Sequence, residues 1–179
     1  MTSGHSVLQV PVPQLEPFVR GRHAHYDQAY VSDDPSFGHA HVTALGPFLP
    51  RDSLTSGALT AVAEIASSTA PFAFTLERID TFPNGIVHLL PNPATTFVAL
   101  TRRLWDAFPQ CPPYAGEFAD VVPHLTLDAV SSEVTEASTA REVAPWLPAA
   151  CRAEQLQLAW YEPAACRVLH AWPLSSASC

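Results

Sequence analysis

The segment HVTAL at residues 41–45 is matched in form by the segment HLTLD at residues 124–128. Each segment begins with a histidine, has a threonine two positions later and carries apolar residues between and after them. Alternation of this kind predicts a β-strand, in which residues i and i+2 face the same side. Each strand would therefore present an imidazole and a hydroxyl on one surface, with Val42, Ala44 and Leu125 packed on the other.

The chain around these two segments repeats one order of elements. Strands are predicted at residues 7–12, 40–45, 72–79, 86–90, 124–130, 156–161 and 167–172, and helices at residues 14–22, 54–67 and 133–146 and after Pro93. The expected N-caps are Asp52 or Ser53 for the second helix and Ser132 for the last. Strand, helix, strand, strand then occurs twice.

The spacing of the histidines supports an internal duplication. His41 and His124 lie 83 positions apart, and His88 and His170 lie 82 positions apart. We expect two βαββ lobes in one domain spanning residues 1–179, although chance similarity among short α/β elements is an open alternative. The predicted fold is α+β and bilobal, with two pseudo-symmetric lobes of antiparallel sheet plus helices around a central cleft.

Composition excludes several classes of function. The 179 residues carry a formal charge of −8, and all nine basic residues are arginine. Without lysine there is no lysyl–AMP intermediate, P-loop lysine or Schiff base. An acidic chain also disfavours extended wrapping of nucleic acid, which needs many phosphate-neutralising cations.

The same sequence indicates a cytoplasmic protein. No apolar run reaches membrane-spanning length, and the first nine residues lack the features of a signal peptide. Cys111, Cys151, Cys166 and Cys179 show no metal-binding spacing and are expected to be ordinary thiols. Membrane partners are therefore not expected. The sequence does not determine the oligomeric state, and we expect a monomer.

The two histidine–threonine segments predict proton-transfer chemistry on a phosphodiester. Two lobes would place both segments across one cleft, where one imidazole accepts a proton and the other donates one. The two hydroxyls would hold non-bridging phosphate oxygens. We expect the rings to face each other within about 5–8 Å, the span of one phosphate with a hydrogen bond on each side. The competing interpretation is a pair of core histidines satisfied by neighbouring threonines.

At these residues the sequence resembles a known family. HVTALGPF at residues 41–48 and PHLTL at residues 123–127 resemble the paired signatures of the 2H phosphoesterase superfamily, in its 2′-5′ RNA ligase-like / RNA 2′,3′-cyclic phosphodiesterase branch. The resemblance extends to the opening strand, to FPNG at residues 82–85 and to residues 112–120. It implies a bilobal α+β fold without metal or nucleotide cofactor. The chain departs from the family in its few basic residues, which disfavours a long RNA substrate.

Other residues are candidates for substrate binding. His88 and His170 occupy matching positions in the repeat and could line the cleft floor, or could be ordinary strand residues. Phe48, Tyr114, Trp160 and Tyr161 lie near the predicted cleft rims, where one or two could stack on a base.

The resemblance implies the reaction. It is hydrolysis of a 2′,3′-cyclic phosphate end of RNA, or of a small cyclic nucleotide, with His124 as base, His41 as acid, and Thr43 and Thr126 stabilising charge. The alternatives are ATP-independent 2′-5′ RNA ligation, which is the same step reversed, and non-catalytic binding of phosphorylated ligands. A metal hydrolase is disfavoured because no Asp, Glu or Cys set accompanies the histidines.

Overall fold

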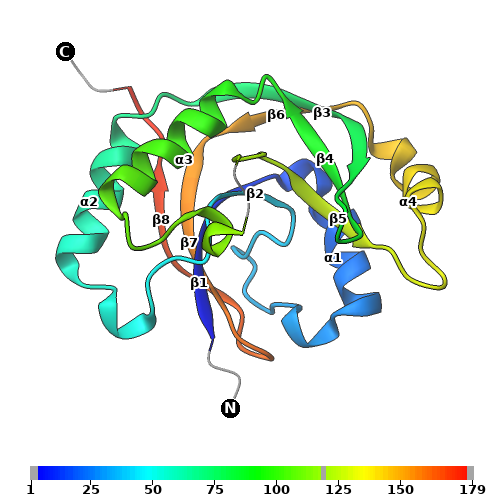
Figure 1. The fold of residues 1–179 in the computed structure, drawn as a ribbon, viewed down its shortest axis with the longest axis horizontal. Helices are drawn as coiled ribbons and strands as arrows, with labels where there is room; N and C mark the ends of the chain where they lie inside the picture. Colours follow the sequence, from blue (N-terminus) through cyan, green and yellow to red (C-terminus); the bar gives the residue numbers. More distant parts are fainter. Residues whose placement is uncertain (1–3, 118–119, 177–179) are drawn as a thin grey trace.

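A computed structural model describes residues 4–117 and 120–176 of the chain. Within these ranges the elements are β1 (His5–Pro11), α1 (Glu16–Tyr26), β2 (His41–Leu45), α2 (Ser56–Ser67), β3 (Phe72–Thr81), β4 (Ile86–Asn92), α3 (Thr95–Ala107), β5 (Leu125–Ala129), α4 (Glu136–Val143), β6 (Ala149–Ala153), β7 (Gln155–Tyr161) and β8 (Arg167–Pro173). The strands form two four-stranded antiparallel sheets (Figure 1). The predicted α+β class is confirmed.

The two sheets have related strand orders. Sheet A runs β2-β1-β7-β8 and sheet B runs β5-β4-β3-β6. Each histidine–threonine segment therefore lies on or next to an edge strand, β2 in sheet A and β5 in sheet B. β2 and β5 contact each other, so the two histidine–threonine segments lie close together.

The prediction that each βαββ repeat forms its own lobe is wrong. The strand pair that follows β2 along the chain, β3 and β4, lies in sheet B beside β5. The pair β7 and β8, which comes after β5, lies in sheet A, with β7 next to β1. Each sheet thus combines the histidine strand of one repeat with the strand pair of the other, and such long-range pairing leaves no trace in local periodicity.

Helix starts differ from the predicted N-caps. α2 begins after Thr55, whose hydroxyl accepts a hydrogen bond from the Ala58 N–H, while Arg51–Ser53 forms a short 3₁₀ turn. α4 is also shorter than predicted, because Thr135 and Ser138 form a capping box at its start. In both helices the N-cap is a threonine that lies two or three residues after the expected residue.

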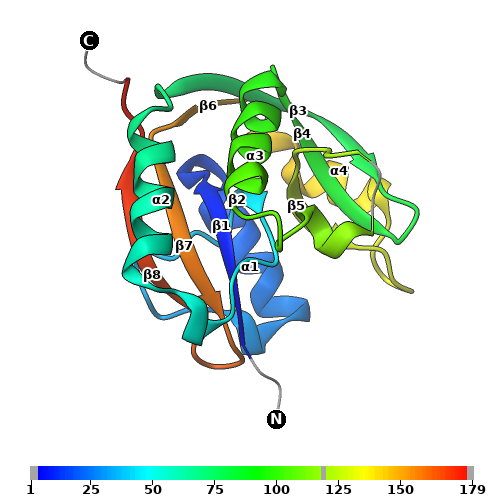
Figure 2. The ribbon, with the colours of Figure 1, turned by 60° about the vertical axis from the view of Figure 1, so that its left-hand side comes forward.

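One core holds the two sheets together. It joins Leu8 and Val42 of sheet A to Leu89 and Leu125 of sheet B, and Leu104 of α3 packs into it. α2 lies along the β7–β8 side of sheet A, and α3 lies between α2 and β4 (Figure 2). α1 contacts β5 and α4 contacts β3, so the helices cover the outside and leave the edge strands β2 and β5 in contact.

Two further findings concern the described part of the chain. No helix there is long and apolar enough to span a membrane. Cys111, Cys151 and Cys166 are buried and carry no disulfide. The fourth cysteine, Cys179, lies outside the described residues.

Candidate active site

His41 begins β2 and is held by the backbone that precedes it. Its Nδ1 lies 3.0 Å from the carbonyl oxygens of both Gly38 and His39. A carbonyl only accepts hydrogen bonds, so Nδ1 carries the proton and Nε2 is the ring atom left for a ligand. Burial lowers the pKa of His41 to about 4, against the opposing effect of the Gly38 carbonyl, so the ring is neutral at pH 7.

A carboxylate on α1 fixes that stretch of backbone. Glu16 accepts a hydrogen bond from His39 Nδ1 at 2.5 Å and, with its other oxygen, one from the Ala40 N–H at 2.8 Å. His39 Nε2 accepts from the Ser32 N–H at 3.0 Å, which sets the His39 tautomer. Glu16 thereby positions the carbonyl groups that orient His41.

His124 directly precedes β5 and is held in the same way. Its Nδ1 donates to the Val122 carbonyl oxygen at 2.7 Å, which again leaves Nε2 for a ligand. The ring stands edge-on to Phe82 and to His88, with centroids 4.8 and 5.3 Å away. Burial lowers the pKa of His124; the Val122 carbonyl opposes this and His88 adds to it.

A tyrosine hydroxyl accompanies each ring. Tyr161 Oη lies 3.5 Å from His41 Nδ1 and donates to Gln9 at 2.6 Å. Tyr114 Oη lies 3.4 Å from His124 Nδ1, and the two rings stack with centroids 5.8 Å apart. The two histidines thus have matching surroundings in the two sheets.

The histidines line two hollows that meet at Tyr114. The His41 hollow measures about 420 Å³ and is lined by His5, Val7, His41, Thr43, Gly46, Pro47, Tyr114 and Tyr161. The His124 hollow measures about 150 Å³ and is lined by Phe82, Asn84, Ile86, Tyr114, Asp120, Val122, His124 and Thr126. Each hollow is therefore lined by one histidine–threonine pair, and Tyr114 lines both.

The backbone of Tyr114 is set for this bridging position. Tyr114 has φ 52° and ψ 36°, the left-handed region that non-glycine residues adopt only at a cost. Its N–H donates to the Gly46 carbonyl oxygen at 2.8 Å, at the end of the HVTALG segment. The ring of Tyr114 stacks on the ring of His124.

The two threonines have polar neighbours across their strands. Thr43 pairs with Gln9 of β1, and Thr126 pairs with His88 of β4. Both threonines are half-buried and line the hollows. Within residues 4–117 and 120–176, neither hydroxyl makes a hydrogen bond to the protein, so both are open to a ligand.

Of the remaining predicted residues, the structure brings some to the hollows and not others. Tyr114, Tyr161 and His88 lie next to the two histidines. Phe48 does not: it is 6% exposed and packs edge-on against Phe108 in the core. Trp160 is also buried and donates to Glu162.

The prediction for His170 is wrong. β8 is the far edge of sheet A, separated from β2 by β1 and β7. His170 is exposed there and stacks on Trp172 at 5.6 Å. Because the strand pairs are exchanged between the sheets, the counterpart of His88 beside Thr43 is Gln9.

Three residues of the site were missed in the sequence. Gln9 carried a signal, since it is a polar residue in the middle of the apolar strand VLQV. His5 stacks on Tyr161 with centroids 5.4 Å apart at the rim of the His41 hollow, and Glu16 acts through His39. Neither carried a local signal, because each acts through a contact with a distant part of the chain.

The charges of the site limit what it can bind. Among the residues found to line the two hollows there is no arginine, and Asp120 is the charged residue present. In the described ranges, no three His, Cys, Asp or Glu side chains are grouped closely enough to hold a metal ion. What the hollows offer is two imidazole Nε2 atoms and two hydroxyls, a set suited to proton transfer around a small tetrahedral group.

Comparison with known proteins agrees with this arrangement. Residues 11–165 match the family model described as the 2′-5′ RNA ligase superfamily. No curated protein sequence matches the chain.

Solved structures with a similar fold share few identical residues with the chain. They include TT0787 of Thermus thermophilus (19% identity, TM-score 0.64, covering 97% of this chain and 100% of that one). E. coli LigT in complex with 3′-AMP (16% identity, TM-score 0.58, 96% and 98%) and a phosphoesterase (16% identity, TM-score 0.57, 97% and 99%) are similar as well. The paired segments, the two-sheet fold and the match over most of the chain agree, and the chain belongs to the 2′-5′ RNA ligase superfamily of 2H phosphoesterases.

Proposed function

We propose that this protein hydrolyses 2′,3′-cyclic phosphate ends of RNA, or small cyclic nucleotides, with His41 and His124 as the acid/base pair and without a metal. The observation that carries the proposal is the matched tautomer of the two rings. Each donates Nδ1–H to a backbone carbonyl, which leaves Nε2 as the ring atom for a ligand, and each ring lines a hollow.

The reaction follows from these positions. One Nε2 takes a proton from water as the water oxygen attacks phosphorus in line, and the other, protonated, gives its proton to the departing ribose oxygen. One P–O bond to the ribose breaks and one P–O bond to the former water forms, which leaves a phosphate monoester beside a free hydroxyl. The family resemblance assigns His124 as base and His41 as acid. Thr43 and Thr126 donate to the non-bridging oxygens as charge builds up on them.

The positive charge for an anionic substrate comes from the histidine pair itself. With no arginine lining the hollows, the protonated histidine supplies the positive charge that the phosphate meets. A bound phosphate in turn favours the imidazolium form, so it raises the pKa of the histidine that serves as acid. LigT has been solved with 3′-AMP, a ribonucleotide carrying a phosphate monoester, which is the kind of product that this reaction releases.

Ligation is the second candidate, and the family match favours it. A ribose 5′-hydroxyl in place of water would attack the same phosphorus, and the P–O3′ bond would break as the new P–O5′ bond forms, with the same two histidines moving the protons. A 2′-5′ phosphodiester would then form without ATP.

A substrate panel in EDTA tests the proposal. It compares 2′,3′-cyclic mononucleotides, ADP-ribose cyclic phosphate, RNA ending in a cyclic phosphate, and that RNA together with a 5′-hydroxyl RNA. Hydrolysis in chelator that is lost in His41→Ala and His124→Ala is expected. Activity that needs one added divalent ion would contradict the proposal, and binding without turnover of any member would identify a non-catalytic module.

A further inference from the structure

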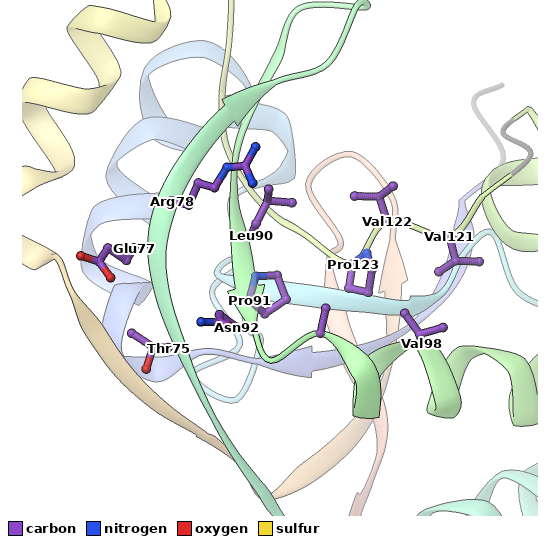
Figure 3. A pocket seen from close by; sticks show the side chains of 11 residues that line it. Thr75, Glu77, Arg78, Leu90, Pro91, Asn92, Val98, Val121, Val122 and Pro123 are labelled. Atoms are coloured by element: carbon purple, nitrogen blue, oxygen red, sulfur yellow. The ribbon is translucent and has the colours of Figure 1, made fainter.

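A third hollow lies beside the His124 hollow. It measures about 520 Å³ and lies between β3, β4, the start of α3 and the segment leading to His124 (Figure 3). We call it the Val122 hollow; it is lined by Thr75, Glu77, Arg78, Leu90, Pro91, Asn92, Ala94, Val98, Val121, Val122 and Pro123. Val122 also lines the His124 hollow, so the two adjoin.

The three hollows follow one another along the molecule. Tyr114 joins the His41 hollow to the His124 hollow, and Val122 joins the His124 hollow to the Val122 hollow. Leu90 is two residues from His88 on β4, so both side chains project from the same face of sheet B. That face also carries Thr126, which pairs with His88. The third hollow therefore continues the surface on which the reaction is proposed to occur.

The three hollows differ in volume, and the His124 hollow is the smallest of them. At about 150 Å³, the His124 hollow is below the roughly 300–1,000 Å³ of typical small-molecule sites and suits a phosphate or part of a ribose. The His41 and Val122 hollows, at about 420 and 520 Å³, fall within that range. Two nucleoside-sized spaces thus each share a lining residue with the smaller reacting space.

The walls of the Val122 hollow suit an uncharged flat group. In Figure 3, Leu90, Val98, Val122 and Pro123 gather around it, and Arg78 extends from β3 over Leu90 while Glu77 points to the other side of that strand. Arg78 has one ion pair, with Asp80 at 3.4 Å, and both side chains are largely exposed. Such a pair contributes little, so the guanidinium can turn to a ligand.

The charges at the Val122 hollow favour a nucleobase over an isolated phosphate. Arg78, Glu77 and Asp80 together carry no net positive charge, so the hollow has no electrostatic preference for an isolated phosphate. An apolar wall with one mobile guanidinium at its edge fits a nucleobase, whose face packs on Val and Pro side chains and on the guanidinium plane.

From these observations we propose that the Val122 hollow is a second nucleoside subsite, which binds the nucleotide unit next to the one that carries the reacting phosphate. The proposal rests on the proposed function for the identity of the substrate. It makes the preferred substrate an oligonucleotide end at least two units long. Ala94, which precedes α3, and Val98 on α3 line the hollow, and Arg78 packs against the base at its edge.

The test measures binding and turnover separately. Calorimetry gives Kd for adenosine 3′-phosphate and for the dinucleotide with the same 3′-phosphate, both of which are phosphate monoesters that the reaction does not consume. Kinetics gives kcat/KM for the corresponding mono- and dinucleotide 2′,3′-cyclic phosphates. We expect the dinucleotide to bind about tenfold more tightly and to react with a correspondingly higher kcat/KM.

Matched variants test whether the preference for the dinucleotide arises in the Val122 hollow. Ala94→Phe fills the hollow, and Arg78→Gln removes its cation; both should reduce the dinucleotide-to-mononucleotide ratio toward one. Thr95→Phe, at the exposed neighbouring position, and Arg102→Gln, exposed on α3, should leave the ratio as in the wild type.

The outcomes separate this proposal from the proposed function. Turnover of the mononucleotide with equal Kd for the two lengths, or an advantage for the dinucleotide that Ala94→Phe leaves intact, would overturn the subsite and leave the function standing. A dinucleotide preference in Kd that Ala94→Phe removes, without turnover of any cyclic phosphate, would support the subsite and count against the function.

Discussion

Thr126 lies directly across the β4–β5 ladder from His88, and no second histidine occupies the equivalent place beside Thr43. Gln9 lies there instead, donating to the Gly38 carbonyl and accepting from Tyr161. The two halves of the site therefore each hold a histidine–threonine pair but differ in the residue that lies beside the threonine. His88 lies edge-on to the ring of His124 and lowers its pKa, while the pKa of His41 is lowered by His23 and raised by Glu16.

His88→Gln tests this difference against His170→Gln. His88 lies edge-on to His124 and lowers its pKa, so its removal should move the limb of the pH profile that His124 sets to higher pH. We expect kcat/KM to fall by less than the roughly 10²-fold that a misplaced catalytic group can cost. His170→Gln, at the exposed edge of sheet A, should behave as the wild type in pH–rate measurements. Equal losses in the two variants would show that proximity to His124 is irrelevant.

Glu16→Gln is expected to weaken catalysis from outside the hollows. An amide has one acceptor oxygen where the carboxylate has two, so either His39 or the Ala40 N–H loses its partner, and the carbonyls that orient His41 become less fixed. We predict a fall in kcat of up to about 10²-fold with little change in KM.

The pH profile distinguishes this positioning role from a structural one. Glu16 acts to raise the pKa of His41, so the acidic limb should move to lower pH in Glu16→Gln. Glu64→Gln, exposed on α2, is the matched control. If kcat and the acidic limb of the pH profile are both unchanged in Glu16→Gln, Glu16 does not position His41.

The pH optimum should lie on the acidic side of neutrality in kcat/KM. Burial lowers the pKa of both His41 and His124 in the free protein, and the reaction needs one ring neutral and the other protonated. The concentration of that mixed state is greatest between the two pKa values, hence below the ordinary histidine value of about 6.5. Because bound phosphate favours the imidazolium, the optimum in kcat should lie at higher pH. Steady-state rates from pH 4 to pH 9 check this, and a kcat/KM that rises through pH 8 would contradict it.

The local features of the fold were predictable from the sequence. The alternation in HVTAL and HLTLD predicts the two histidine strands, and the strands predicted at residues 72–79 and 86–90 pair as β3 and β4 around a turn in which Gly85 has φ 89°. The apolar spacing after Pro93 predicts α3, and the resemblance of the two segments predicts the family. Each of these signals is carried by residues close together in the chain.

Long-range pairing was not predictable in this way. β6 is the alanine-rich segment Ala149–Ala153, whose composition does not favour a strand; its pairing with β3 defines it. The exchange of strand pairs between the sheets places His88 near the site and His170 far from it. Glu16 is a helix residue whose partners, His39 and Ala40, lie 23 and 24 positions away.

The central claim is that His41 and His124 act as one acid/base unit, and a double-mutant comparison of kcat/KM on a 2′,3′-cyclic phosphate tests it most directly. His41→Ala and His124→Ala should each reduce the rate by about 10²–10⁴-fold, the contribution of a proton-transfer group. Thr43→Ala and Thr126→Ala should each cost less, toward the lower limit of about 10²-fold for one charge-stabilising donor.

The double histidine variant should be little slower than either single variant, because removing one member already disables the pair. Circular dichroism and thermal unfolding confirm that each variant is folded. A folded single histidine variant whose kcat/KM falls by less than about tenfold would contradict the claim. So would a double variant whose loss equals the product of the two single losses, since the histidines would then act independently.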